Sequence, residues 1–271
     1  MAFAATMVRY SNYSYEPSLG QRVSAGKALI EDYPVGQEIS SKLWEMLSDA
    51  QWFAQRVMPG TRSEVINQSF FDGANQMEPG SVDLIITSPP YLNNYHYNRN
   101  TRPQMYWLGF AHRPADFRLL EQQNVGKYWQ TVREKKTISL AFHLPNSDLE
   151  AQIAHLRSLR ADKGIYGGHG WANYAASYFN DCQRFAQSVN FVLKPGGRAL
   201  VVIGNSILQG VLISTDQYLA QIAELEGLEL VRIDIPRATR VGNSIIQSDV
   251  RAEKASKKAQ LYEAVVELRK P

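Results

Sequence analysis

The chain has 271 residues, of which 44% are hydrophobic and 20% charged, and its net charge at neutral pH is +3. These values are typical of a globular protein with its own core, and so small a charge does not by itself indicate a nucleic-acid partner. No apolar run reaches the roughly 20 residues that cross a bilayer, the first residues lack a signal-peptide pattern, and the single cysteine, Cys182, cannot form an internal disulfide. We therefore expect a cytoplasmic protein without a membrane partner.

The first third of the chain contains one clear helix and one clear strand. Residues 1–36 show no sustained period and are interpreted as an irregular arm. From Glu38 to about Val57, apolar residues recur at helical spacing, which predicts a helix. "SEVINQ" (63–68) is a candidate for a short strand, whereas "VDLIIT" (82–87) predicts a strand more strongly because a turn sequence introduces it.

The middle of the chain is predicted to be helical. A helix is expected over 97–109, and short helices near 115–124 and 147–160 lie within a mostly polar region, 112–170, which we interpret as an insertion. The clearest helix runs from about Trp171 to Leu193. Its predicted buried stripe consists of Tyr174, Tyr178, Cys182, Phe185, Val189 and Val192.

The remaining elements predict an α/β sheet covered by helices. "LKPGG" (193–197) turns the chain into an apolar strand over 198–204 that is expected to be buried on both faces. A helix over 215–225 leads into a strand that starts near Leu228, and residues 262–269 form the last strand. The expected organisation is therefore an arm (1–36), an α/β domain (37–111 with 171–271) and the helical insertion (112–170).

The sequence "TSPPY" directly follows the strand over 82–87. In an open α/β sheet, ligands bind beyond the carboxyl ends of the strands. Each proline fixes its own φ and lacks an N–H, so the turn presents carbonyl acceptors beside a serine hydroxyl and an aromatic ring. This combination suits an exocyclic amine on a flat heterocycle, with Tyr91 as the stacking surface, and requires no metal ion. A base in a duplex would have to leave the stack to reach such a site.

Ser88-Pro89-Pro90-Tyr91 resembles the signature of the DNA amino-methyltransferases, which methylate cytosine N4 or adenine N6 with S-adenosylmethionine. "YLNNYHYNRNTRPQMYWLGF" and "LKPGGRALVVIGNS" are similar to the segments that follow this signature in the family. The resemblance implies a Rossmann-like S-adenosylmethionine-dependent methyltransferase sheet. It also implies that Ser88 and the Pro89 carbonyl hold the target amine, and that Tyr91 stacks on the base. The serine form, preceded by Thr87, is most similar to the cytosine-N4 branch, although some adenine enzymes share it.

The resemblance also implies contacts with the cofactor and with DNA. Asp72 and Thr87 are the candidates for cofactor contact, although Ser69 aligns nearly as well as Asp72. Residues 112–170 are a candidate DNA-contact region, as is the loop over 237–258. The individual DNA-contact candidates are Asn93, Asn94, Arg237, Arg240, Arg251 and Lys254, although capping of the loop is the plainer interpretation of the two asparagines. DNA and a cognate restriction endonuclease are the implied partners.

One part of the family's site has no counterpart in the sequence. The family binds its cofactor at a glycine-rich loop after the first strand, and its first strand lies beside the fourth. The densest glycine cluster, "IYGGHGW" (165–171), follows no strand, so an entry loop to the next helix is a plainer interpretation than a cofactor loop. We therefore expect an incomplete sheet that lacks its first two strands, as in the carboxyl-terminal part of a methylase. A complementary chain, a truncated gene or a dimer contact would each account for this.

Three functions remain open on the sequence alone. The first is a cytosine-N4 DNA methyltransferase that depends on a complementary chain. The second is an adenine-N6 DNA methyltransferase or an RNA amino-methyltransferase. The third is a DNA-binding subunit or fragment without catalytic activity, which the missing glycine loop favours.

Overall fold

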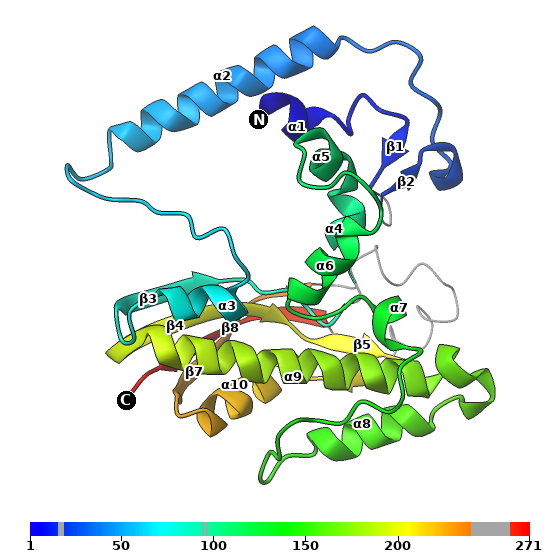
Figure 1. The fold of residues 1–271 in the computed structure, drawn as a ribbon, viewed down its shortest axis with the longest axis vertical. Helices are drawn as coiled ribbons and strands as arrows, with labels where there is room; N and C mark the ends of the chain where they lie inside the picture. The colour runs from blue at the N-terminus through cyan, green and yellow to red at the C-terminus, as the bar shows by residue number, and fades with distance from the viewer. Residues whose placement is uncertain (16–18, 94, 96, 240–260) are drawn as a thin grey trace. The chain divides into compact units, whose positions relative to one another are not determined.

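The computed structural model describes residues 1–271 except 16–18, 94, 96 and 240–260 (Figure 1). The chain divides into two compact units, one comprising Met1–Ile66 and His96–Leu120 and the other Asn67–Tyr95 and Glu121–Pro271. None of the helices in the described ranges is long and apolar enough to cross a membrane.

The first unit is built from short elements around a small core. Its elements are α1 (Ala2–Thr6), β1 (Tyr13–Ser14), β2 (Gly20–Gln21), the 3₁₀ turn η1 (Val23–Ala25), α2 (Val35–Ala54), α4 (Tyr97–Asn100), α5 (Arg102–Trp107) and most of α6 (Asp116–Gln123). The buried Asn100 side chain accepts a hydrogen bond from the Leu19 backbone N–H at 2.8 Å. Residues expected to form an irregular arm therefore contribute short helices, a two-stranded ladder and buried side chains to this unit.

Helix α2 confirms the helix predicted from Glu38 onward. None of its residues is buried, however, and the exposed fractions of Leu43, Trp44 and Phe53 are 54%, 69% and 60%. Arg9, which follows α1, holds the helix through an ion pair with Glu38 at 2.5 Å. The apolar period thus predicted the helix but not burial of its apolar side chains.

The second unit contains the main sheet and the long helix. Its elements are α3 (Phe70–Gly73), η2 (Ala74–Gln76), β3 (Val82–Thr87), α7 (Trp129–Val132), α8 (Leu149–Ser158), η3 (Ala161–Tyr166), α9 (Gly168–Val192), β4 (Leu193–Gly204), β5 (Ser206–Leu208), β6 (Val211–Ile213), α10 (Thr215–Leu225), β7 (Glu229–Thr239) and β8 (Leu261–Arg269). The predicted α/β class is confirmed. The predicted strand over 63–68 is wrong, because those residues form no ladder.

The sheet is mixed, with the strand order β3-β4-β8-β7. β3 pairs with β4 in parallel, whereas β8 is antiparallel to both β4 and β7. Helices α9 and α10 pack against one face of the sheet (Figure 1). The side chains on this face are buried and form the core with the α9 stripe; they include Ala199, Val201, Ile203, Val266 and Leu268.

The opposite face of the sheet is only partly covered in the described structure. Leu84 and Ile86 of β3 are 52% and 69% exposed, and Leu200 and Val202 of β4 are only partly buried. The expectation that β4 is buried on both faces is therefore wrong. Farther across this face, Glu267 of β8 forms ion pairs with arginines on both neighbouring strands, so the apolar surface is concentrated beside β3.

β3 is an edge strand among the described residues, because β4 is its only neighbour there. At the start of this pair, Lys194 Nζ lies 2.8 Å from each carboxylate oxygen of Asp83. Gly197 allows the close approach, since a Cβ there would lie 2.9 Å from the Lys194 carbonyl oxygen and 3.1 Å from that of Val82. The "LKPGG" segment thus fastens β4 to β3.

Helix α9 confirms the predicted stripe, because Tyr174, Tyr178, Cys182, Phe185, Val189 and Val192 are all buried. The fully buried Asn173 on the same helix fixes the preceding loop. Its side-chain oxygen accepts from the Ile138 N–H at 2.9 Å, and its amide nitrogen donates to the carbonyls of Lys135 at 3.0 Å and Lys136 at 3.3 Å. The buried Asn173 side chain therefore provides the hydrogen-bond partners that a strand or helix would otherwise give to the backbone of that loop.

Candidate active site

Ser88-Pro89-Pro90-Tyr91 leaves the carboxyl end of β3, where the sequence predicted a ligand site. Ser88 is exposed, Pro89 is buried, and Pro90 and Tyr91 are partly buried. The turn lies at the same end of the sheet as Gly204, the last residue of the parallel strand β4. The motif therefore combines an accessible residue, Ser88, with residues that are packed against the rest of the unit.

The Tyr91 ring lies against Gly204. A Cβ at that position would be 3.0 Å from Tyr91 Cδ2 and 3.1 Å from Cε2. The Tyr91 hydroxyl donates a hydrogen bond to Glu263 Oε1 at 3.1 Å, and Glu263 is the residue of β8 that pairs with Gly204. Gly204 on β4, which has no side chain, and the Glu263 carboxylate on β8 together fix the Tyr91 ring at the carboxyl end of β3.

The two carbonyls of the proline turn have different surroundings. The Pro90 carbonyl accepts a hydrogen bond from the hydroxyl of the buried Tyr178 at 3.0 Å. The Pro89 carbonyl accepts none from the part of the chain that the structure describes. The long helix thus fixes the turn through one carbonyl and leaves the other as an acceptor beside Ser88.

The Tyr91 phenol is held in its protonated form. Burial raises its pKa above the ordinary value; the Ser88 hydroxyl acts in the opposite direction, and the Glu263 carboxylate raises the pKa further. At neutral pH the hydroxyl is therefore a hydrogen-bond donor to Glu263, and the ring carries no charge.

A second row of polar contacts supports the end of β4. The Thr215 hydroxyl donates to the Gly204 carbonyl, and the Asn205 side chain accepts from the Tyr262 N–H at 2.9 Å. The Tyr262 hydroxyl donates to both carboxylate oxygens of Asp216, at 3.0 and 3.1 Å. Burial and the Asp216 carboxylate raise the pKa of Tyr262 to about 12.

We expect Tyr262→Phe to make the stability of the protein less sensitive to alkaline pH. Because the folded-state pKa lies above the ordinary value of about 10, the contribution of Tyr262 is complete below pH 10 and is lost as the pH approaches 12. Urea unfolding of wild type and variant between pH 9 and pH 12 tests this. The same pH slope in both proteins would contradict it.

The other predicted contact residues lie in varied settings. Asp72 is exposed on α3, Thr87 is the partly buried last residue of β3, and neither makes a described contact with the proline turn. Asn93 caps its own loop, since its side-chain oxygen accepts from the Tyr95 N–H at 3.1 Å. Arg237 pairs with Glu263 in the β7–β8 register, in line with Gly204. Asn94, Arg240, Arg251 and Lys254 lie outside the described residues.

The glycine cluster over 167–170 is explained by helix packing. A Cβ at Gly167 would lie 2.1 Å from the Arg160 carbonyl oxygen, and one at Gly168 would lie 1.9 Å from that of Leu156. Gly170 would similarly meet the Ile165 carbonyl oxygen at 2.2 Å. The space beside these glycines is filled by backbone, so this cluster leaves no room for the methionine part of S-adenosylmethionine.

Sequence reasoning did not identify three residues that position the site. Tyr178 was predicted only as part of the buried stripe, and Glu263 only as a residue of the last strand. Gly204 was the last residue of a predicted strand. Each acts through a contact with a segment remote in sequence, which a local pattern does not contain.

Comparison with known proteins finds relatives among DNA methyltransferases. No family model matches the chain. The chain is 24% identical to the type II methyltransferase M.AvaI of Nostoc sp. over 261 residues, which are 93% of this chain and 52% of M.AvaI. It is 23% identical to the type II methyltransferase M.BsoBI of Geobacillus stearothermophilus over 228 residues, which are 78% of this chain and 44% of M.BsoBI. These relatives confirm the predicted resemblance, and the chain spans about half of their length.

Solved structures give weaker matches. A Thermus thermophilus protein described as a DNA modification methylase, in complex with S-adenosyl-L-methionine, matches with a TM-score of 0.36 and 12% identity, covering 75% of this chain and 54% of that one. Another structure of the same protein matches with a TM-score of 0.34 and 13% identity, covering 75% and 52%.

Proposed function

We propose that this chain is the base-holding part of a DNA methyltransferase that modifies the exocyclic amine of a flipped base, cytosine N4. One observation carries the proposal: Ser88-Pro89-Pro90-Tyr91 stands at the carboxyl end of β3 with its ring fixed and its Pro89 carbonyl without a donor among the described residues. The type II methyltransferases M.AvaI and M.BsoBI, which the chain resembles over most of its length, support the same activity.

The chain's own residues would hold and orient the base. The Tyr91 ring offers a stacking surface backed by Gly204, and the Pro89 carbonyl and the Ser88 hydroxyl accept the two amine hydrogens. These bonds draw the amine lone pair out of conjugation with the ring. Positioning of this kind accounts for much of the rate enhancement in group transfer. Flipping the base out of the duplex costs roughly a few kcal/mol. Stacking of the base on Tyr91 and contacts with DNA would offset this cost.

Cytosine N4 is favoured over adenine N6 by the serine form of the motif, which resembles the cytosine branch. The chemistry of an amine held by two acceptors suits either base. Adenine-N6 methylation of DNA, or amino methylation of RNA, is therefore the second candidate. The identity of the methylated nucleoside separates these possibilities directly.

We infer that the methyl donor is held by residues outside the described part of this chain. S-adenosyl-L-methionine supplies the methyl group when it is bound. The described glycine cluster is occupied by backbone, and the β3 edge has no partner strand among the described residues, with Leu84 and Ile86 exposed beside it. Because folded proteins usually cover a long apolar edge, a complementary chain that pairs with β3 and carries the cofactor loop fits both observations.

Calorimetric titration of the purified chain with S-adenosyl-L-methionine tests the inferred division of the site. We expect no binding by a folded, monodisperse sample. Micromolar affinity would mean that this chain completes the cofactor pocket by itself, and the complementary chain would not be needed.

We expect a charge at the β3 edge to abolish methylation in cells, because the edge would no longer pair with the complementary chain. Ile86→Lys places the charge there, and Ile235→Lys on β7 is the matched control; the two side chains are 69% and 52% exposed, so both variants should fold. Each variant is introduced into a strain of the source organism that lacks the gene. Restoration of DNA methylation by Ile86→Lys would contradict the proposed pairing.

DNA contact is proposed for residues 112–170 and for residues 237–258, of which 237–239 belong to β7 and the rest lie outside the described residues. The register places Arg237 in the same row as Glu263 and Gly204, which supports a phosphate contact at this end of the sheet. The type II relatives also support a cognate restriction endonuclease as a functional partner. A DNA-binding chain without catalytic activity remains the third candidate, and loss of the gene would then leave the methylated nucleosides unchanged.

A further inference from the structure

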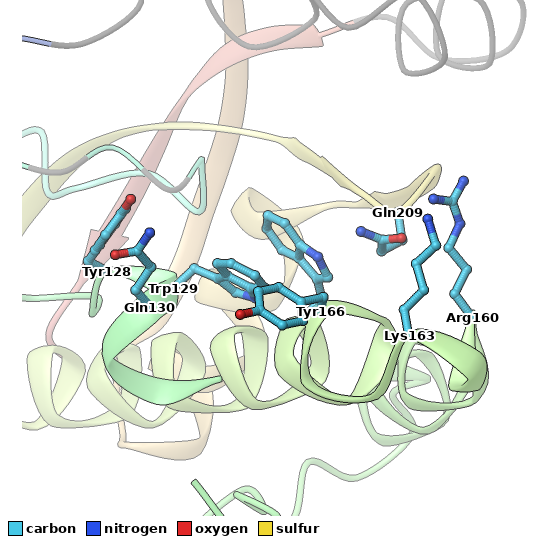
Figure 2. Close-up of a pocket in the computed structure, with 8 residues that line it drawn as sticks. Tyr128, Trp129, Gln130, Arg160, Lys163, Tyr166 and Gln209 are labelled. Carbon is cyan, nitrogen blue, oxygen red and sulfur yellow. The ribbon is translucent and has the colours of Figure 1, made fainter. Parts of the chain in front are cut away.

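A hollow of about 380 Å³ opens in the unit that carries the proline turn. Its volume falls in the range of ligand pockets in proteins. Aromatic side chains from α7, η3 and α9 line it together with two cations, Arg160 and Lys163, and two amides, Gln130 and Gln209 (Figure 2). None of the lining residues is acidic. The proposed base-holding residues Ser88 to Tyr91 do not line this hollow.

The aromatic wall of the hollow is held by contacts on several sides. Trp129 and Trp171 stack with centroids 5.1 Å apart and an interplanar angle of 22°. The Arg133 guanidinium lies 4.7 Å from the Trp129 ring centroid and 4.8 Å from that of Tyr166. Trp171 is 8% exposed, whereas Tyr166 is 58% exposed. The wall therefore combines fixed indole rings with an accessible phenol ring.

The two cations extend from the turn that precedes α9. Arg160 and Lys163 are exposed, and neither forms an ion pair with any residue in the described ranges. In Figure 2 their side chains point the same way, toward the turn between β5 and β6 that carries Gln209. Two uncompensated cations beside aromatic rings are the components of sites that bind unpaired nucleic acid, where bases stack and phosphates pair with charge.

The hollow lies within reach of the proline turn. Gln209 is the fifth residue after Gly204, which contacts the Tyr91 ring. Five residues span at most about 18 Å even when fully extended. A DNA strand rises about 3.4 Å per nucleotide, so Gln209 lies within a distance of about five nucleotides from a base held at Tyr91.

We propose that this hollow binds an unpaired nucleotide of the DNA substrate within about five nucleotides of the flipped base. The base of this nucleotide stacks on the aromatic wall at Tyr166, and the amides of Gln130 and Gln209 contact the edge of the base. Arg160 and Lys163 pair with the phosphate of the same nucleotide. The inference rests on the proposed function and adds to it a second site that keeps the strand open near the target base.

Binding of fluorescent oligonucleotides to the full chain tests the proposal without requiring methyl transfer. The probes are a 12-nucleotide DNA single strand, its duplex and the RNA strand of the same sequence, each measured by anisotropy over a series of salt concentrations. The variants are Arg160→Gln with Lys163→Gln, Tyr166→Ala and Tyr166→Phe. Arg56→Gln with Arg62→Gln is the matched control, because it removes two charges from exposed arginines that do not line the hollow and lie outside the segments proposed to contact DNA.

We expect the Arg160/Lys163 variant to weaken single-strand binding and to reduce the slope of log K against log salt by about 0.7, since the two cations pair with one phosphate and each phosphate contact to a single strand contributes about 0.7. Tyr166→Ala should weaken binding at least about fivefold, the lower limit for loss of one stacked base. Tyr166→Phe keeps the ring and should bind like the wild type. The Arg56/Arg62 control should retain the wild-type slope and single-strand affinity.

Three results would overturn the proposal: equal single-strand affinity in all variants, no measurable binding of single-stranded DNA by the wild type, or tighter binding of the RNA strand. None of them decides the proposed methyltransferase function, which is read separately from methylated nucleosides in cells. Conversely, loss of binding in the pocket variants together with unchanged nucleosides on deletion of the gene would support the nucleotide site while rejecting the methyltransferase.

Discussion

Replacing Tyr91 by alanine is expected to lower the initial rate of DNA methylation by about 100-fold. Stacking of a base on an aromatic ring is worth about 1–3 kcal/mol, and the upper end applies here because the ring is fixed between Gly204 and Glu263. The rate is measured after induction of the gene in a strain of the source organism that lacks it, so that any complementary chain is present.

Tyr91→Phe is the matched control for this prediction. It keeps the ring against Gly204 and removes only the hydroxyl that donates to Glu263. Loss of one such hydrogen bond costs about 1 kcal/mol, so the rate should fall by no more than about tenfold. Equal rates for Tyr91→Ala and the wild type would exclude Tyr91 as the stacking surface.

Asn173→Ala is expected to destabilise the folded chain by about 3 kcal/mol, because a part-buried N–H and part-buried carbonyls would lose their partners. The amide binds Ile138 on one side and the carbonyls of Lys135 and Lys136 on the other, with no exposed surface of its own. Urea unfolding at neutral pH measures the effect, and the variant should also loosen the loop that follows α7.

Asn180→Ala provides the comparison two helical turns farther along α9. Asn180 makes the same kind of bonds, accepting from the Ala141 N–H at 2.8 Å and donating to the Ser139 carbonyl at 3.0 Å. These bonds are exposed, so water can replace the side chain and the cost should stay near 1 kcal/mol or less. Equal losses of stability in the two variants would show that burial does not determine the contribution of Asn173.

The sequence predicted the elements whose pattern is local. β3, α10 and β8 lie within a residue or so of their expected bounds, because alternation and helical period depend only on neighbouring residues. The buried stripe of α9 was predicted for the same reason. The proline turn was predicted at the carboxyl end of β3 because two consecutive prolines cannot continue a paired strand.

Contacts between distant segments could not be predicted in this way. The bond between Tyr91 and Glu263 depends on β8 pairing with β4 in a particular register, and nothing near either residue specifies that pairing. The role of Tyr178 at the Pro90 carbonyl is hidden for the same reason, since a tyrosine in a buried stripe already has an explanation.

The expectation that β4 is buried on both faces failed because apolar residues need not be buried, as helix α2 also shows. The α2 period is regular, yet none of its side chains is buried. β4 is apolar throughout residues 199–203, yet Leu200 and Val202 on its outer face are only partly covered in the described structure. A sequence pattern indicates which surface of a helix or strand is apolar. Whether that surface is buried depends on which other segments pack against it.

The nucleosides of genomic DNA test the central claim most directly. The gene is deleted from its source organism, and the DNA is digested and analysed for N4-methylcytosine and N6-methyladenine before and after complementation. We expect N4-methylcytosine to fall on deletion, to return with the wild-type gene and to return far more slowly with Tyr91→Ala. Unchanged nucleosides on deletion, or full restoration by Tyr91→Ala at the wild-type rate, would contradict a methyltransferase that holds its target base at Ser88 to Tyr91.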